Sequence, residues 1–236
     1  MWDKDLKPAV VMVHGLWMTG LEMGLLGRRL QGFGFSCYRF PYSSLRQTPA
    51  YNADALADFV TDLARRHPLV HLLGHSLGGR VIELTLSRHY LPAPGRVLTL
   101  ATPFGGSHIA HSLARRNWTR VMLGASAPAL LTPLSRWHHQ RPLGIIAGDL
   151  GIGIGLFFPG LTKPHDGTVT LEETVIKGAT ARFTVPATHM SMLFSREVAI
   201  LASAFLQTGA FVANPAKAPH TVVNTAPGAV CRRNGK

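Results

Sequence analysis

A serine flanked by glycines is the residue in this sequence with the clearest chemical potential. It lies in the pentapeptide Gly74-His75-Ser76-Leu77-Gly78, and a further glycine follows at position 79. A serine hydroxyl attacks a carbonyl carbon efficiently only when a neighbouring base removes its proton and a third group orients that base. An ordinary glycine-rich turn with a serine at the start of a helix can have the same sequence. The elements on either side must therefore show whether Ser76 is a nucleophile or part of such a turn.

A histidine near the end of the folded part of the chain is the strongest candidate for the base. His189 follows a short apolar run, residues 181–185, and precedes an amphipathic stretch, residues 191–207. An imidazole titrates near neutrality, which suits a general base in acyl transfer. The other histidines flank strands, lie in an irregular segment or belong to the C-terminal tail, and we expect structural roles for them.

The acid that orients this imidazole is expected between the serine and the histidine in the chain. Asp166 lies in a loop after a predicted strand at residues 143–147 and is the favoured candidate. Asp149 follows that strand immediately and is the competing candidate. Glu83 and Glu197 lie within predicted helices, where we expect them at the surface.

Apolar runs and amphipathic stretches alternate along the first hundred residues. Short apolar runs predict strands buried on both faces, and apolar residues at helical spacing predict helices. This alternation predicts a parallel sheet with helices on both faces and every strand-to-helix loop at one edge. The predicted strands are residues 9–13, 35–40, 69–73 and 96–101, and the predicted helices are residues 21–30, 52–66 and 79–90.

The serine lies between one of these strands and one of these helices. The glycines at positions 74 and 78 allow a sharp turn that presents the serine hydroxyl at the sheet edge. The free N–H groups at the start of the helix point to the same place. The sequence therefore predicts that Ser76 is a nucleophile.

Two backbone N–H groups are expected to bind the oxyanion that forms during acyl transfer. We expect one to belong to Leu77, directly after the serine, and the other to Leu16, in the loop after the first strand. Side chains beside these groups are expected to contact the substrate, namely Trp17, His75, Phe104 and Met190.

Five segments together resemble the lipase and esterase branch of the α/β-hydrolase superfamily, and small bacterial lipases in particular. The resemblance extends over about residues 8–207, although such relatives often carry a histidine where this chain has Phe104. It implies a three-layer α/β/α sandwich with a mostly parallel, reduced sheet of about six strands and a small helical cap. It also implies hydrolysis of carboxylic esters without a metal or an organic cofactor. The segments are Val11-Met12-Val13-His14-Gly15-Leu16, Gly74-His75-Ser76-Leu77-Gly78-Gly79, Ala101-Thr102-Pro103-Phe104-Gly105-Gly106-Ser107, Asp166-Gly167-Thr168-Val169 and His189-Met190.

One α/β-hydrolase domain is expected over residues 1–212. Residues 104–142 interrupt the alternation and are long for a connection, so we expect a cap or lid over the site. Their tryptophans and leucines either line an acyl pocket or pack the cap onto the body. Residues 213–236 are rich in proline, alanine and basic residues, and we expect a loosely ordered basic tail.

The composition is strongly basic, with 24 Lys and Arg residues against 12 Asp and Glu residues and a formal charge of +12. A nucleic-acid partner is not expected, because the basic residues are scattered and no RNA-binding signature is present. The charge is compatible with peripheral contact with an anionic membrane surface. The polar N-terminus favours a cytoplasmic protein unless a secretory signal has been removed. Cys37 and Cys231 are expected to be unpaired thiols.

Three kinds of activity remain open from the sequence. The first is a carboxylesterase or lipase that acts on an ester or lipid through Ser76, His189 and Asp166. The second keeps the same acyl-enzyme but is an acyltransferase, thioesterase or amidase, since the pocket and not the triad sets specificity. The third is a non-catalytic relative that binds lipid or protein.

Overall fold

A seven-stranded sheet in the order β2-β1-β3-β4-β5-β6-β7 forms the centre of the computed structural model, which describes residues 7–211 and 223–224. The two-residue strand β7 (Val223–Asn224) is antiparallel to β6, and the other strands run parallel. The prediction of a mostly parallel sheet of about six strands is confirmed. The parallel strands are β1 (Ala9–Val13), β2 (Ser36–Arg39), β3 (Val70–His75), β4 (Val97–Leu100), β5 (Leu143–Gly148) and β6 (Ala181–Val185).

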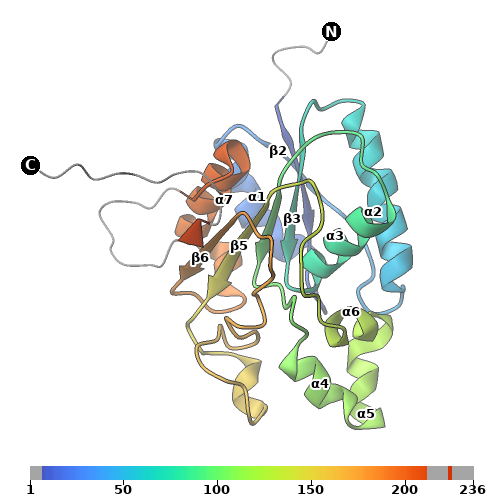
Figure 1. Ribbon diagram of the computed structural model, residues 1–236, viewed down its shortest axis with the longest axis vertical. Coiled ribbons are helices and arrows are strands. Elements are labelled where there is room, and N and C mark those ends of the chain that lie inside the picture. Colours follow the sequence, from blue (N-terminus) through green and yellow to red (C-terminus); the bar gives the residue numbers. More distant parts are fainter. Residues whose placement is uncertain (1–6, 212–222, 225–236) are drawn as a thin grey trace, which may run out of the picture.

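Helices cover both faces of the sheet and complete three layers (Figure 1). Helices α1 (Gly24–Gly32) and α7 (Arg196–Thr208) cover one face, and α2 (Pro49–Ala64) and α3 (Leu77–Arg88) cover the other. Successive residues of a strand point to opposite faces. In β1, Val11 packs into the core beneath α2 and α3, whereas Val10 packs beneath α1 and α7. This arrangement explains why the strand sequences are apolar without alternation.

A group of short helices lies beyond the carboxyl ends of the strands, at the lower end of Figure 1. They are α4 (His108–Ala114), α5 (Asn117–Arg120), the 3-10 helix η2 (Val121–Ser126) and α6 (Ala127–Leu131). Three further 3-10 helices are η1 (Leu21–Met23), η3 (Ile154–Phe157) and η4 (Ser191–Phe194). Of the helices between residues 7 and 211, none combines the length and the apolarity needed to cross a bilayer.

The end of the chain differs from the sequence prediction. The single helix predicted for residues 191–207 is divided, because the Ser195 hydroxyl accepts the N–H of Val198 and starts α7 after η4. The tail predicted for residues 213–236 lies outside the described residues, except for β7, which was not predicted. Cys37 has a free thiol, and Cys231 also lies outside the described residues.

The strand order reverses between β1 and β3. From β1 the chain passes to β2 at one edge and then returns to β3 on the other side of β1. In open α/β sheets the loops diverge at such a point and leave a crevice at the carboxyl ends of the strands. The loop after β1 and the serine turn after β3 both lie at this position.

Candidate active site

A sharp turn presents Ser76 between β3 and α3. Its backbone is strained, with φ 53° and ψ −121°. A Cβ on Gly74 would lie 2.5 Å from the backbone nitrogen of Gly79, and a Cβ on Gly78 would overlap the carbonyl oxygen of Val13. Only glycine therefore fits at positions 74 and 78, as the turn prediction requires.

Two hydrogen bonds join the backbone of the serine to the neighbouring chain segment. The Ser76 N–H donates to the carbonyl of Leu100 at 2.8 Å, and the Thr102 hydroxyl donates to the carbonyl of Ser76 at 2.9 Å. Both partners lie at the end of the neighbouring strand β4 or just after it. The next strand therefore holds the strained turn in place.

Strained backbone is concentrated at one edge of the sheet. Among the described residues other than glycine, positive φ angles occur at Trp17 (61°), Ser76 (53°) and Ala101 (49°). These residues follow β1, β3 and β4, which are neighbours in the sheet. Each such residue costs of order 1–3 kcal/mol, and strain of this kind gathers at functional sites. The backbone alone therefore points to this edge.

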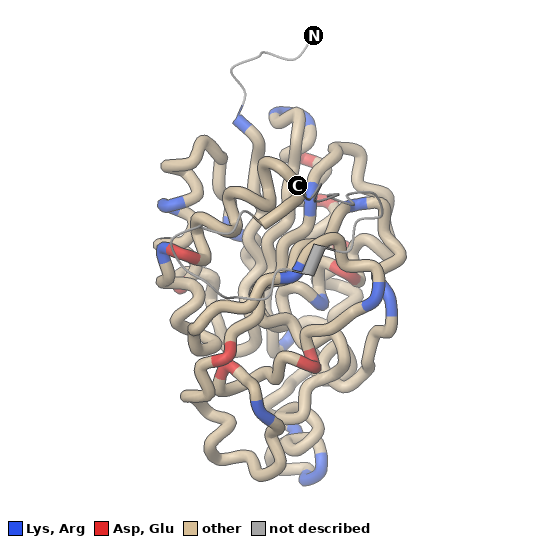
Figure 2. Tube along the Cα trace, turned by 60° about the vertical axis from the view of Figure 1, so that its left-hand side comes forward, with Lys and Arg blue, Asp and Glu red and all other residues tan. Residues whose placement is uncertain are grey.

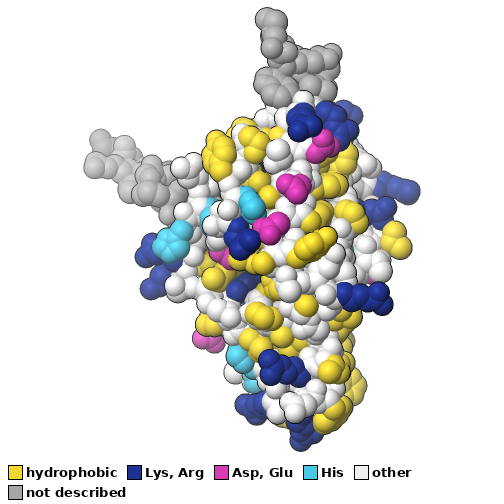
Figure 3. Space-filling view, turned by 90° about the vertical axis from the view of Figure 1, so that its right-hand side faces the viewer, with side chains coloured by type: hydrophobic (Ala, Val, Ile, Leu, Met, Phe, Trp, Pro, Cys, Tyr) yellow, Lys and Arg dark blue, Asp and Glu magenta, His cyan; other side chains and the backbone are white. Residues whose placement is uncertain are grey.

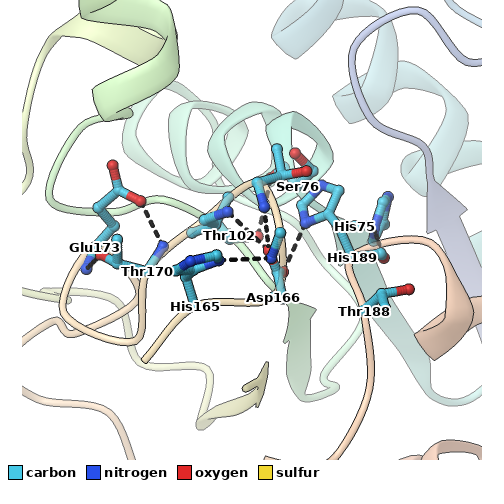
Figure 4. Close-up of polar contacts among 12 residues, drawn as sticks. His75, Ser76, Thr102, His165, Asp166, Thr170, Glu173, Thr188 and His189 are labelled. Atoms are coloured by element: carbon cyan, nitrogen blue, oxygen red, sulfur yellow. Dashed lines mark hydrogen bonds and ion pairs between the residues drawn. The ribbon is translucent and has the colours of Figure 1, made fainter. Parts of the chain in front are cut away.

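A buried histidine–carboxylate pair lies beside the serine (Figure 4). His189 follows β6, and its Nδ1 lies 2.7 Å from Oδ2 of Asp166. The N–H of His189 also donates to the carbonyl of Asp166 at 2.8 Å. The second carboxylate oxygen of Asp166 accepts the N–H groups of Thr168 and Val169, at 2.9 and 2.7 Å. The chain thus fixes both the acid and the imidazole that it contacts.

The electrostatics of this pair favour an ionised carboxylate. Burial raises the pKa of Asp166, but the charge and hydrogen bond of His189 and the two N–H groups outweigh burial and lower it. A carboxylate at Oδ2 requires that Nδ1 of His189 carries the proton. The other ring nitrogen, Nε2, is then free to accept a proton, and Figure 4 shows the ring on the side of Asp166 that faces Ser76.

The competing acid has a different environment. Asp149 directly follows β5, and its side chain is exposed. Its backbone N–H donates to the carbonyl of Val185 at 3.2 Å. Of the two predicted candidates, the structure brings only Asp166 into contact with His189. Glu83 also differs from expectation, because its side chain is only 13% exposed and lies 3.4 Å from His139.

A second histidine packs against the first. His75 is fully buried, and its ring centroid lies 4.7 Å from that of His189. Its Nε2 donates to the carbonyl of His189 at 3.0 Å, while its buried Nδ1 has no partner within the described residues. Burial, followed by the charge of His189, lowers the pKa of His75 to about 3, so the ring is neutral. His75 therefore holds the backbone of His189, although it also reaches the cavity wall.

The loop after β1 lies against the serine. A Cβ on Gly15 would lie 3.2 Å from the Cβ of Ser76 and 3.2 Å from Nδ1 of His75. The next residue, Leu16, lines the same cavity as Ser76. Within the described residues, neither the N–H of Leu16 nor that of Leu77 donates a hydrogen bond. Both predicted oxyanion donors are therefore unpaired.

An apolar cavity of about 310 Å³ opens beside Ser76 and His189. Trp17, His75 and Met190, which the sequence predicts at the substrate, lie on its wall. Phe104 lies elsewhere: it is fully buried in the core, in edge contact with Trp137. The short helices and η3 supply further apolar wall residues, which are Ile109, Ala110, Leu113, Leu123, Leu130 and Ile154.

Several wall residues have no signal in the sequence that identifies them. Leu123 and Leu130 belong to the predicted cap, but Ile154 lies in a glycine-rich loop that showed no helical or strand pattern. Thr168 and Val169, which follow Asp166 closely in the chain, also line the cavity.

Within the described residues, no group of three His, Cys, Asp or Glu side chains is arranged to hold a metal ion.

The fold and this turn define a class of protein. A buried parallel strand that leads through a Gly-x-Ser-x-Gly turn into a helix is characteristic of α/β hydrolases. The sequence pattern of the alpha/beta hydrolase family matches residues 10–224. The chain therefore belongs to the alpha/beta hydrolase family, and this membership supports hydrolase activity. No protein of curated function matches the sequence significantly.

Solved structures share the fold at low sequence identity. A lipase of Bacillus licheniformis, BlEst2 in its mature form, is 22% identical over 88% of this chain and 93% of that one, with a TM-score of 0.69. The metagenomic carboxyl esterase MGS0156 is 15% identical over 80% of this chain and 66% of that one, with a TM-score of 0.61. The RedJ thioesterase of Streptomyces coelicolor is 16% identical over 86% and 90%, with a TM-score of 0.57. At these identities the similarity shows the fold alone.

Proposed function

We propose that this protein hydrolyses carboxylic esters through an acyl-enzyme on Ser76, with His189 as general base and Asp166 as its orienting acid. The observation that carries the proposal is the hydrogen bond between Asp166 and His189, because His189 lines the same cavity as the strained serine. No hydrogen bond joins Ser76 to the His189 ring among the described residues. Such bonds are often long without substrate and shorten when substrate binds.

The first half of the reaction forms the acyl-enzyme. Oγ of Ser76 bonds to the ester carbonyl carbon while Nε2 of His189 accepts the hydroxyl proton. The carbonyl oxygen becomes an oxyanion, which accepts hydrogen bonds from the unpaired N–H groups of Leu16 and Leu77. When the tetrahedral intermediate collapses, the bond to the alcohol oxygen breaks and His189 returns the proton to the leaving alcohol.

The second half releases the acid. Water attacks the acyl carbon, His189 accepts its proton, and the bond to Oγ of Ser76 breaks as His189 returns the proton to the serine. Asp166 stabilises the imidazolium in both halves, because its ionised carboxylate accepts a hydrogen bond from the Nδ1–H of His189 while the proton stays on the ring.

The cavity supports an ester with an apolar chain. Its volume of about 310 Å³ has room for roughly ten groups of water or methylene size. Its wall near the short helices is formed by Leu113, Leu123 and Leu130. We assign residues 104–142 as the cap of a single hydrolase domain, and chains of medium length as the preferred substrates.

A series of p-nitrophenyl esters tests this proposal. We expect kcat/KM to rise from acetate to octanoate and to fall for palmitate, which exceeds the cavity. Ser76→Ala should abolish turnover, while Ser87→Ala, which removes an exposed serine hydroxyl, should leave it unchanged. Retained turnover in Ser76→Ala would refute the mechanism. Faster turnover of matched thioesters or amides would instead assign the same site to those substrates.

A further inference from the structure

Two exposed apolar segments project beside the mouth of the cavity. On α5 and η2, Trp118 and Val121 are 69% and 73% exposed, and Met122 is 44% exposed. At η3, Leu156 and Phe157 are 72% and 83% exposed. Large apolar side chains gathered at one place on a surface mark a site of contact with a partner or a membrane.

Both segments are tied to the cavity itself. The indole N–H of Trp17, a wall residue, donates to the carbonyl of Met122 at 2.7 Å. Ile154 of η3 lies on the same wall. Nε2 of His108, at the start of α4, lies 3.1 Å from the carbonyl of Pro159, just after η3. The two projections therefore border one opening.

Basic residues accompany the first segment. Arg115, Arg116 and Arg120 are all exposed. The sequence has no acidic residue between Glu83 and Asp149, and none between Asp149 and Asp166. The lower tip in Figure 2 accordingly carries blue segments without red ones, and the lower end of Figure 3 shows basic and hydrophobic side chains close together.

We propose that this face, the docking face, binds the surface of a lipid bilayer that contains anionic headgroups. It consists of Arg115, Arg116, Trp118, Arg120, Val121, Met122, Leu156 and Phe157. Apolar side chains enter the boundary between headgroups and acyl chains, and arginines beside them bind headgroup phosphates. An aliphatic and aromatic rim around an apolar opening fits this partner, because the cavity then opens toward the lipid. Because the arginines of the docking face are positively charged, the lipid that it binds is anionic.

The two parts of the docking face make separate contributions to binding. Each Lys or Arg close to an anionic membrane contributes about 1 kcal/mol, and this attraction weakens as salt screens it. The apolar part is independent of headgroup charge and is insensitive to salt. Substitutions in each part therefore have distinguishable effects.

Co-sedimentation with vesicles tests the docking face without any turnover. The full chain and its Ser76→Ala variant are mixed with vesicles of phosphatidylcholine alone or with 30% phosphatidylglycerol. We expect binding to the mixed vesicles at least about tenfold stronger than to phosphatidylcholine, with most of this difference lost in 0.5 M NaCl. Because binding is measured directly, failure of the proposed ester hydrolysis would leave this result unchanged.

Matched variants locate the contact. R115E/R116E should weaken binding to the mixed vesicles about tenfold or more, whereas R65E/R66E, an exposed pair directly after α2, should change it less than about twofold. L156S/F157S should weaken binding in high salt as well, whereas Tyr90→Ser, which removes an exposed aromatic elsewhere, should not. These four variants, each made in the chain that keeps Ser76, should turn over a soluble short ester at the wild-type rate.

The opposite results would overturn the inference. It fails if the protein does not sediment with mixed vesicles, or if R65E/R66E weakens binding as much as R115E/R116E. It also fails if the docking-face variants bind as the wild type does, since the contact would then lie elsewhere. A stable complex with a protein that survives high salt and is lost in L156S/F157S, without vesicle binding, would assign the face to a protein partner.

Discussion

The two carboxylate oxygens of Asp166 have different partners, and this division determines what the residue can do. One oxygen accepts hydrogen bonds from two backbone N–H groups, and the other accepts a hydrogen bond from the Nδ1–H of His189. An asparagine at position 166 has one oxygen and one NH₂ group. If its oxygen keeps the backbone N–H groups, its NH₂ group faces Nδ1 of His189; if its oxygen faces Nδ1, the backbone hydrogen bonds are lost. The imidazole would then adopt the wrong tautomer, with its basic nitrogen turned away from the serine.

Replacement of Asp166 by Asn should therefore lower kcat by about 10³- to 10⁴-fold, with a smaller effect on KM. Asp149→Asn is the matched control, because Asp149 follows β5 but is exposed and does not touch His189; its kcat should change less than about threefold. Steady-state kinetics on one p-nitrophenyl ester compares the two variants. A larger loss in Asp149→Asn would identify that residue as the acid.

His75 is expected to act through His189 as a positioning residue. Its Nε2–H donates to the carbonyl of His189, and a single such bond contributes about 1 kcal/mol. His75→Phe should lower kcat about fivefold with little change in KM, and His75→Gln, which keeps a donor near the same point, should recover most of it. The melting temperature of each variant is measured in parallel. Equal kcat losses in both variants would argue against this role.

The residues proposed for the chemistry were easier to predict from the sequence than the residues that line the cavity. Ser76 and His189 come shortly after strands, Asp166 lies in the loop between β5 and β6, and all parallel strands have their carboxyl ends at one edge. Their proximity could thus be predicted from element order, while their catalytic roles stay predictions. Phe104 could not be placed correctly, because adjacency to a motif does not say whether a side chain faces the cavity or the core. Ile154 was missed because its loop reaches the cavity only in three dimensions.

At the scale of elements, the serine turn depends on how closely β3, α3 and β1 approach. A methyl group at position 78 would overlap the carbonyl of Val13 in β1. α3 would have to move away from the sheet, and the backbone around Ser76 would move with it.

Gly78→Ala should therefore lower the free energy of unfolding by about 2–3 kcal/mol and reduce turnover of any ester. Gly24→Ala is the matched control, since Gly24 begins α1 in helical geometry and has no atom within 4 Å of an added Cβ. That change should raise the free energy of unfolding by up to about 1 kcal/mol. Urea denaturation measures both, and equal stability of the two variants would show that the turn is not tightly packed.

The existence of the main strands and helices followed from apolar runs and helical spacing, and the predicted ends of β1 and β6 match the structure, but the predicted ends of several helices do not. α2 begins earlier than predicted, because Thr48 caps it and Pro49 occupies its first turn. η4 and α7 were predicted as one helix, because Ser195 interrupts a continuous apolar pattern only through its capping bond. Strand β7 has two residues, too few to produce any pattern.

At the scale of the whole molecule, buried neutral histidines make the fold sensitive to acid. Burial, with the charges of Arg96 and Arg141, lowers the pKa of His71 to about 4. An unfolded chain binds a proton at this residue below about pH 6.5, whereas the folded protein does not until about pH 4. Stability is therefore lost as pH falls between these values, by about 1.4 kcal/mol per pH unit. His75, with its pKa lowered to about 3, acts in the same direction.

His71→Phe should flatten this dependence. The variant loses the bond from the N–H of Arg96 to Nδ1 of His71 and should be less stable at pH 7.5. Between pH 7 and pH 5, however, it should lose about 2 kcal/mol less stability than the wild type. Urea unfolding at several pH values measures both slopes, and identical slopes would show that His71 is not neutral in the folded protein.

All of the chemistry proposed for this hydrolase depends on one activated hydroxyl. A fluorophosphonate probe reacts with a serine only when a base removes its proton and nearby donors bind the developing charge. Labelling followed by peptide mass spectrometry should place one adduct on Ser76 in the wild type and none in Ser76→Ala, with labelling strongly slowed in Asp166→Asn. An adduct on another residue, or an unlabelled Ser76 in a protein that still cleaves esters, would contradict the account.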